Sequence, residues 1–117
     1  MGKLSTHVLD TANGQPAAGL KVDLFFLGGA SRQHLGSFRT NSDGRTDSPL
    51  LSDEDMVTGV FELVFHVGEY YDKLAIKLPE PMFLDAVPVR FGIARESDSY
   101  HVPLLVSPYG YSTYRGS

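Results

Sequence analysis

The strongest constraint on the fold is a segment in which every second side chain is apolar. Between residues 57 and 67, one set of alternate positions includes Phe61 and Phe65, and the set between them includes Glu62 and His66. A period of two is that of a β-strand, whose successive side chains point to opposite faces of a sheet. A chain built from such strands must bury the apolar face of each sheet against a second layer.

The same alternation predicts further strands, which are separated by turns rich in glycine, proline, asparagine and aspartate. They cover residues 4–10, 20–27, 33–40, 87–94, 100–107 and 109–115. The chain contains 12 glycines and 7 prolines, which divide it into short segments of this kind. The turn at residues 107–110 predicts that the last two strands form a hairpin. Without a linker or an internal repeat, residues 1–117 are expected to form a single domain.

One segment departs from the strand pattern. Between residues 69 and 78 the apolar spacing changes to three and four residues, as at Leu74 and Leu78, which predicts a helix. Pro79 and Pro81 are expected to end it. The pattern as a whole therefore predicts an all-β protein, an antiparallel sandwich of seven to eight strands with one short helix.

Composition excludes several classes of protein. The 10 lysines and arginines are outnumbered by 14 acidic residues, for a net charge of -4, and no basic patch is evident, so we expect no nucleic-acid partner. The absence of cysteine excludes disulfides and thiolate chemistry. No signal peptide, membrane-spanning run or phosphate-binding glycine motif is recognised, so we expect no membrane partner and no cofactor, and a cytoplasmic protein.

The four histidines are candidate acid–base groups, because imidazole titrates near neutral pH. His34 and His66 have ordinary polar neighbours on predicted strands, and we interpret both as solvated side chains. His7 and His101 lie on strand faces that also carry apolar residues such as Leu9. That mixture is typical of an outer sheet face covered by another subunit. The spacing alone also allows a purely structural role for each of these two histidines.

The remaining polar candidates are individually weak. Arg45 follows the turn at residues 41–44, where it is either a fixed cation at the mouth of a loop or an ordinary exposed arginine. Neither His7 nor His101 has a carboxylate or a third histidine at ligand spacing, so no metal is expected. The acidic run at residues 53–55 is interpreted as a solvated loop. Any active site must therefore combine residues from distant parts of the chain.

Three separated segments resemble one known family. The final residues, Tyr114-Arg115-Gly116-Ser117, are similar to the end of the 5-hydroxyisourate hydrolases, the enzymatic branch of the transthyretin family. Residues 4–10, Leu-Ser-Thr-His-Val-Leu-Asp, followed by Gly14 and Pro16, resemble the family's first signature, and residues 40–45 resemble its central turn. Hormone-carrying transthyretins lack the two histidines, the arginine and this ending, so the resemblance is to the enzymes.

The resemblance also implies an assembly and a set of site residues. It implies a homotetramer in which the outer sheets of two dimers face each other across a central channel. Two groups of residues would line that channel: the catalytic residues His7, Arg45, His101 and Ser117, and the substrate-binding residues Leu105, Ser112 and Tyr114. Ser112 and Tyr114 share the parity that the channel face requires.

The implied reaction is the hydrolytic opening of the cyclic amide of 5-hydroxyisourate, a small molecule formed in urate degradation, to 2-oxo-4-hydroxy-4-carboxy-5-ureidoimidazoline. Such a reaction needs a base for water, a donor for the oxyanion and an acid for the leaving nitrogen. We expect His101 to be the base, His7 to orient or relay the proton, and Arg45 to bind the carbonyl or anionic edge. Ser117 supplies a hydroxyl and a carboxylate, or alternatively a nucleophile, although the sequence offers it no dedicated base.

Two other function classes compete with the hydrolase. The first is a transthyretin-type carrier of a small hydrophobic ligand in the channel. Tyr114 argues against a carrier because its ring would fill space that the ligand needs. The second is a scaffold sandwich without a ligand, and two histidines on one channel face argue against it.

Overall fold

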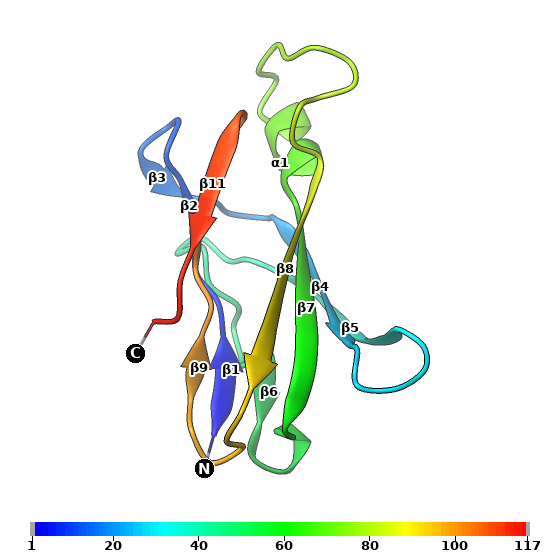
Figure 1. The fold of residues 1–117 in the computed structure, drawn as a ribbon. Coiled ribbons are helices and arrows are strands. Elements are labelled where there is room, and N and C mark those ends of the chain that lie inside the picture. The colour runs from blue at the N-terminus through cyan, green and yellow to red at the C-terminus, as the bar shows by residue number, and fades with distance from the viewer. Residues whose placement is uncertain (1, 117) are drawn as a thin grey trace.

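The computed structural model describes residues 2–116. They form two layers of β-strands packed face to face, with one α-helix at the upper end (Figure 1). The elements, in chain order, are β1 (Lys3–Ser5), β2 (Val8–Asp10), β3 (Gln15–Pro16), β4 (Lys21–Phe26), β5 (Gln33–Arg39), β6 (Leu51–Ser52), the 3-10 helix η1 (Asp53–Asp55), β7 (Gly59–His66), α1 (Val67–Lys73), β8 (Ala86–Ile93), β9 (Tyr100–His101), β10 (Leu104–Ser107) and β11 (Gly110–Thr113).

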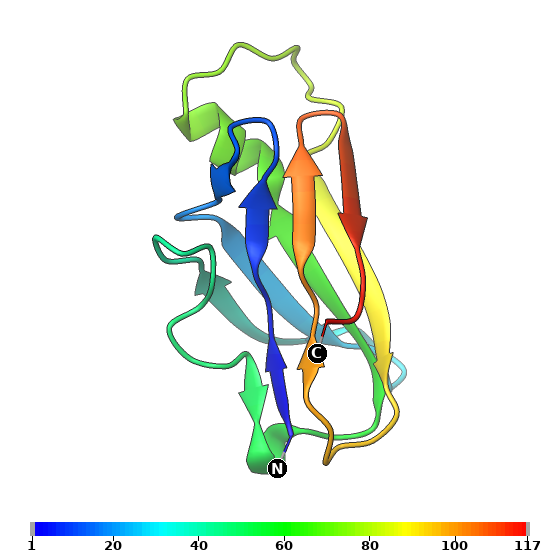
Figure 2. The same ribbon diagram turned by 90° about the vertical axis from the view of Figure 1, so that its left-hand side faces the viewer.

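The two layers differ in their pairing. The first layer contains the N-terminal strands: β6-β1-β9 continues upward into β3-β2-β10-β11, as Figure 2 shows. The second layer is an antiparallel sheet in the order β5-β4-β7-β8. The predicted sandwich is confirmed, but β1 pairs with β9, and β2 with β10, in parallel. These two partners are therefore joined by a long connection through the opposite layer, which the hairpin pattern could not reveal.

The predicted strands 4–10 and 100–107 each break into two. Pro103 has no N–H for a ladder, and Thr6 turns its hydroxyl onto the carbonyl of Val102, at 2.7 Å. The chains nevertheless stay side by side, because the amide of Val102 donates to Ser5 and that of Leu104 donates to His7, both at 2.9 Å. The break leaves the two strands in contact along their whole length.

The core lies between the layers and follows the predicted alternation. Phe61 and Phe65 of β7 are almost completely buried, as are Leu4 and Val8 of the first two strands and Leu24 of β4. Burial of such side chains contributes roughly 2 kcal/mol each to folding. The alternate residues therefore face outward, and on the first layer that outer face carries the predicted site.

The helix differs from its predicted boundaries. It was expected over residues 69–78 but spans Val67–Lys73, and the prolines lie beyond its end. Ala75 has a positive φ of 57°, a conformation that stops a helix. At the other end, the amide of Gly68 donates to Asp85 at 3.0 Å and holds the first turn against the segment before β8. Tertiary contacts have thus shifted the helix toward β7.

A buried carboxylate fastens this helix to the first layer. Asp10 is 1% exposed, and its oxygens accept hydrogen bonds from the hydroxyls of Tyr70 at 2.8 Å and Tyr71 at 2.9 Å, and from the Asn13 amide at 2.7 Å. Burial acts to raise the pKa of Asp10, but these hydrogen bonds outweigh it and hold the pKa below its usual value. Burial and the neighbouring carboxylate raise the pKa of Tyr70 to about 12.

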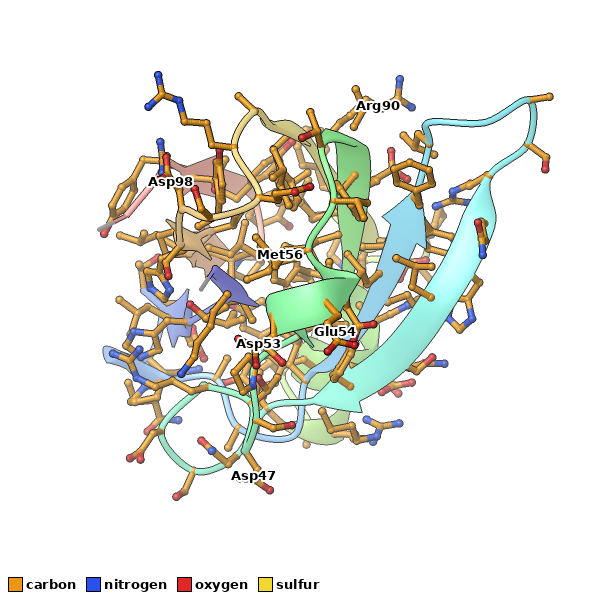
Figure 3. All side chains as sticks on the ribbon, turned by 90° about the horizontal axis from the view of Figure 1, so that it is seen from below. Asp47, Asp53, Glu54, Met56, Arg90 and Asp98 are labelled. Atoms are coloured by element: carbon orange, nitrogen blue, oxygen red, sulfur yellow. The ribbon has the colours of Figure 1, made fainter. Side chains whose placement is uncertain are left out.

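Two further sequence interpretations concern polar side chains on the outside. The acidic run at residues 53–55 forms the exposed helix η1 at the lower end of the molecule, with Asp53 and Glu54 facing solvent (Figure 3). His34 and His66 lie on the outer face of the second layer, but both bond Asp23, at 3.1 and 2.7 Å. The interpretation of these two as simply solvated was therefore incomplete. No helix among residues 2–116 is long and apolar enough to cross a bilayer.

Candidate active site

A tight turn places Arg45 beside the first layer. The side-chain oxygen of Asn41 accepts the amide hydrogens of Asp43 at 2.9 Å and Arg45 at 3.2 Å, which is an Asx turn. Gly44 has φ of +76°, and a Cβ there would lie 2.5 Å from the carbonyl oxygen of Val8. Only glycine satisfies both demands. The turn can therefore press against β2, and Arg45 forms a β-bridge with His7.

His101 is held between the first strand and the C-terminal segment. It pairs in register with Ser5, whose Oγ lies 2.9 Å from His101 Nδ1. On its other side it bridges to Gly116, whose amide donates to the His101 carbonyl at 2.7 Å. A Cβ at position 116 would lie 2.7 Å from His101 Cδ2. The imidazole is thus fixed at two edges of its ring.

The electrostatic environment of His101 favours its neutral form. Burial, and then the positive charge of Arg45 and of His7 when protonated, lower the pKa of His101 from its usual value. The three side chains share one face, because His7 bridges to Arg45 and Ser5, two residues before His7, pairs with His101. A neutral imidazole at neutral pH is able to accept a proton from water.

A polar hollow adjoins these residues. It has a volume of about 180 Å³ and is lined by Ser5, Thr6, Arg45, Thr46, Asp47, Ser48 and Pro49. Asp47 is itself held by the side-chain amide of Asn41 at 3.0 Å. The residues around the hollow thus include Arg45, which carries a guanidinium, Asp47, which carries a carboxylate, and Ser5, which carries a hydroxyl. Within residues 2–116, no group of three or more histidine, cysteine or carboxylate side chains is arranged to hold a metal ion.

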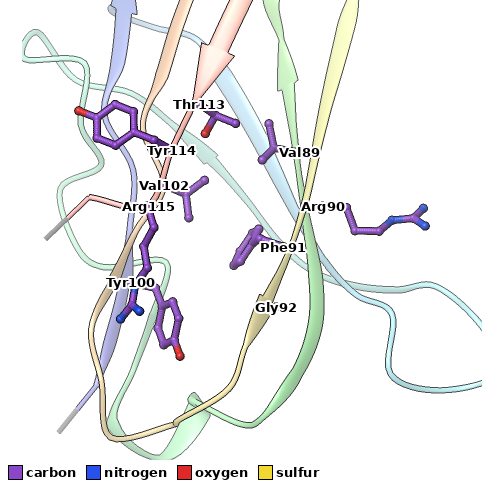
Figure 4. Close-up of a pocket in the computed structure, with 9 residues that line it drawn as sticks. All are labelled: Val89, Arg90, Phe91, Gly92, Tyr100, Val102, Thr113, Tyr114 and Arg115. Atoms are coloured by element: carbon purple, nitrogen blue, oxygen red, sulfur yellow. The ribbon is translucent and has the colours of Figure 1, made fainter.

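The predicted substrate-binding residues lie higher on the same layer. Leu105 pairs directly with Ser112 on β11 and with Leu9 on β2, so all three share one face. In Figure 4 the Tyr114 side chain lies on the opposite side of the chain from Thr113, which has the reverse parity. Tyr114 is 60% exposed. Ser117, the fourth predicted catalytic residue, lies outside the described residues.

A second hollow, of about 150 Å³, lies between the two layers where β8 and β11 form their open edges (Figure 4). Its lining is largely apolar, with Phe91 and Tyr100 prominent, and the Arg115 guanidinium stacks 4.1 Å above the Tyr100 ring. None of the predicted catalytic residues lines it. The polar hollow beside Arg45 is the better candidate for hydrolysis, since it alone of the two is lined by Arg45 and by Ser5, the hydrogen-bond partner of His101.

Sequence reasoning missed the contribution of Ser5 and Asp47. Ser5 shares the strand face of His7, which was a usable signal, but its partner lies in the last third of the chain and only the parallel pairing brings them together. Asp47 follows Arg45 by two residues, yet its side chain is placed by Asn41. Neither contact follows from local sequence spacing.

Comparison with known proteins identifies the family. The sequence model of the HIUase/Transthyretin family matches residues 4–116. The chain belongs to this family. The resemblance inferred from the three sequence segments is thereby confirmed, and the polar hollow of this HIUase/Transthyretin family member lies between two of those segments, the first and the central turn.

Three of the similar proteins are named as enzymes. The "5-hydroxyisourate hydrolase 2" of Rhizobium meliloti (strain 1021) is 59% identical over 116 residues, which cover 99% of this chain and 97% of the relative. A solved Klebsiella pneumoniae 5-hydroxyisourate hydrolase superimposes with a TM-score of 0.82 at 32% identity, covering both chains completely. A solved (S)-allantoin synthase gives a TM-score of 0.94 at 44% identity, over 99% of this chain and 44% of the synthase, so this chain spans less than half of that protein.

Proposed function

We propose that this protein hydrolyses the cyclic amide of 5-hydroxyisourate to 2-oxo-4-hydroxy-4-carboxy-5-ureidoimidazoline. The observation that carries the proposal is the convergence of His7, Arg45 and His101 on one face of the first layer, from three distant parts of the chain: His7 bridges to Arg45, and Ser5, two residues before it, pairs with His101. The high identity to a named 5-hydroxyisourate hydrolase supports the hydrolase over a transthyretin-type carrier. No cofactor takes part in the reaction that we propose.

In the mechanism that we propose, His101 is the general base. Its Nδ1 is occupied by Ser5, so Nε2 is the nitrogen that takes the proton from water. The water adds to the amide carbonyl, and Arg45 donates hydrogen bonds to the oxygen on which negative charge develops. The carbon–nitrogen bond then breaks, and His7 relays a proton to the leaving nitrogen. Ser117 is proposed to complete the site with its hydroxyl and terminal carboxylate.

We also propose a homotetramer, in which the outer face of the first layer lines a channel between subunits. The side chains of that face support this proposal: Tyr114 is 60% exposed, and Leu9 and Leu105 are half-buried rather than enclosed in the core. Leu105, Ser112 and Tyr114 would then contact the substrate from the channel wall. A cytoplasmic location is proposed for the assembly, to be tested by cell fractionation.

The proposed reaction can be followed directly. Urate and urate oxidase generate the substrate, and its ultraviolet absorbance decays faster when a hydrolase is present. We expect the purified protein to accelerate that decay and His101→Asn to lose on the order of a hundredfold of the rate. His34→Asn is the matched control, because it removes a histidine from the other layer. A wild-type protein that leaves the decay at its uncatalysed rate would refute the proposal.

A further inference from the structure

The hydrogen bond between Ser5 and His101 determines which ring nitrogen of the proposed base reacts, so the part played by Ser5 itself can be inferred from its geometry. It is 2.9 Å long and partly buried, and it joins residues 96 positions apart. Ser5 and His101 are direct partners in the parallel β1–β9 pair, so their side chains leave the sheet on the same face. The backbone pairing of β1 with β9 therefore holds these two side chains next to each other.

The contact decides which ring nitrogen of His101 is free. A neutral imidazole carries its proton on one nitrogen and a lone pair on the other. Gly116 packs against Cδ2 and Ser5 against Nδ1, so the Nε2 side of the ring remains for a reacting molecule. A general base needs its lone pair at that nitrogen, and the proton must then sit on Nδ1.

We propose that Ser5 is a positioning residue for the hydrolysis: its Oγ accepts the Nδ1–H of His101 and so keeps the lone pair on Nε2. The inference rests on the proposed function, in which His101 is the base. Because the Ser5 hydroxyl accepts from His101, its own hydrogen is free to donate into the polar hollow that Ser5 and Arg45 both line. Ser5 thus acts through His101 and is not itself the base.

A substitution of Ser5 by a neutral residue leaves the charged groups around Ser5 and His101 unchanged. Arg45 and His7 face His101 from the turn and from the first strand, and Asp47 lines the hollow beside Ser5. An Nδ1–H donates more strongly when the ring is an imidazolium. Loss of the Ser5 acceptor therefore destabilises the protonated ring, which moves the pKa of His101 further down.

Steady-state kinetics on 5-hydroxyisourate test the proposal. Ser5→Ala is expected to lower kcat roughly five- to tenfold, the net effect of one lost hydrogen bond, with KM little changed. The acidic limb of its pH–rate profile is expected to move to lower pH, and Ser5→Thr, which keeps the hydroxyl, is expected to restore both. Ser37→Ala is the matched control, because Ser37 bonds Asp23 and lies 3.2 Å from His34 Nε2 in the other layer.

Nitrogen-15 spectra of the imidazole give a second readout that does not need the reaction. In the wild type, at a pH where His101 is neutral, the proton is expected on Nδ1, and Ser5→Ala is expected to shift it toward Nε2. Unchanged spectra in Ser5→Ala would overturn the proposal, and so would a wild-type rate in that variant. A lower rate in Ser5→Ala would also overturn it if Ser5→Thr did not restore the rate and if the acidic limb of the pH–rate profile stayed in place. A wild-type protein with no activity would instead refute the proposed function, and the spectra would still decide the role of Ser5.

Discussion

At the scale of single residues, the acid–base behaviour of His101 depends on a neighbouring cation. Burial is the larger influence on its pKa, and the guanidinium of Arg45 is the next. A fixed positive charge disfavours a second positive charge nearby. The arginine therefore favours the neutral imidazole, in addition to the contact with substrate that we propose for it.

Arg45→Gln is expected to raise the pKa of His101. The substitution removes the positive charge while keeping a polar side chain of similar reach, so the imidazolium is less disfavoured. Titration of the His101 ring by NMR measures the change, and any residual activity should have its acidic limb at higher pH. Arg39→Gln is the control. Arg39 lies in the second layer, where it pairs with Glu69 of α1, and its substitution should leave the titration of His101 unchanged. An identical His101 titration in Arg45→Gln would contradict the interaction.

Gly116→Ala is expected to impair hydrolysis without unfolding the protein. The added Cβ would lie 2.7 Å from His101 Cδ2, so either the ring or the C-terminal segment must move. A displacement of a catalytic group by a fraction of an ångström to an ångström costs on the order of tenfold to a hundredfold in rate. The measurements are kcat/KM and the melting temperature.

Gly29→Ala provides the control for this substitution. A Cβ at position 29 meets nothing within 4 Å, so activity and melting temperature should both match the wild type. If Gly116→Ala also keeps the full rate, the C-terminal segment does not fix the His101 ring.

At the scale of elements, the sandwich depends on a few polar anchors as well as on its core. Asp10 ends β2 and receives both tyrosine hydroxyls of α1, so the carboxylate joins the helix to the first layer. Its pKa is below that of an unfolded aspartate, near 3.9. Its contribution to stability is therefore complete above about pH 4 and is lost as the pH falls through the lower, folded-state pKa.

Asp10→Asn is expected to lower the free energy of unfolding by about 2 to 3 kcal/mol at neutral pH, because hydrogen bonds to a charged acceptor are replaced by weaker and partly mismatched ones. Urea unfolding measures this loss. The variant should also lose less stability than the wild type on acidification below pH 4. Tyr70→Phe, which removes one of the donors, should show a smaller loss. Equal stability of Asp10→Asn and the wild type would mean that the anchor contributes nothing net.

The strands could be predicted from sequence because their pattern is local. Phe61, Leu63 and Phe65 repeat at a spacing of two residues, which a strand but not a helix places on one face, and that face is the buried one. The helix boundaries could not, since they depend on contacts of Tyr70 and Tyr71 with a residue sixty positions away. The parallel pairing of β1 with β9 was equally hidden, because alternation identifies a face but not a neighbour.

The candidate site was predictable to a similar degree. The family motifs indicated His7, Arg45 and His101, and alternation placed both histidines on outer faces. The hydroxyl of Ser5 could not be recognised, because its value lies in the register of a long-range pair. The Asp23 contacts of His34 and His66 were missed for the same reason, since they join three strands.

At the scale of the whole molecule, we expect a tetramer in solution. A protein with this much exposed aromatic surface, including Phe83, Tyr109 and Tyr114, has a strong tendency to associate. Light scattering should give four times the mass of the chain at assay concentration. A monodisperse monomer with full activity would contradict both the channel and its proposed lining residues.

The parallel β1–β9 pair also has a consequence for how the protein is made. Ser5 leaves the ribosome early, while His101 follows only after the whole second layer has been synthesised. Contacts between such distant residues form late, because a long loop must close first. Until β9 has been synthesised, the edge of β1 that pairs with it is therefore unpaired and accessible to other nascent chains. A chain interrupted before β9 would carry His7 and Arg45 without His101, so only an essentially finished polypeptide can assemble the site that we propose.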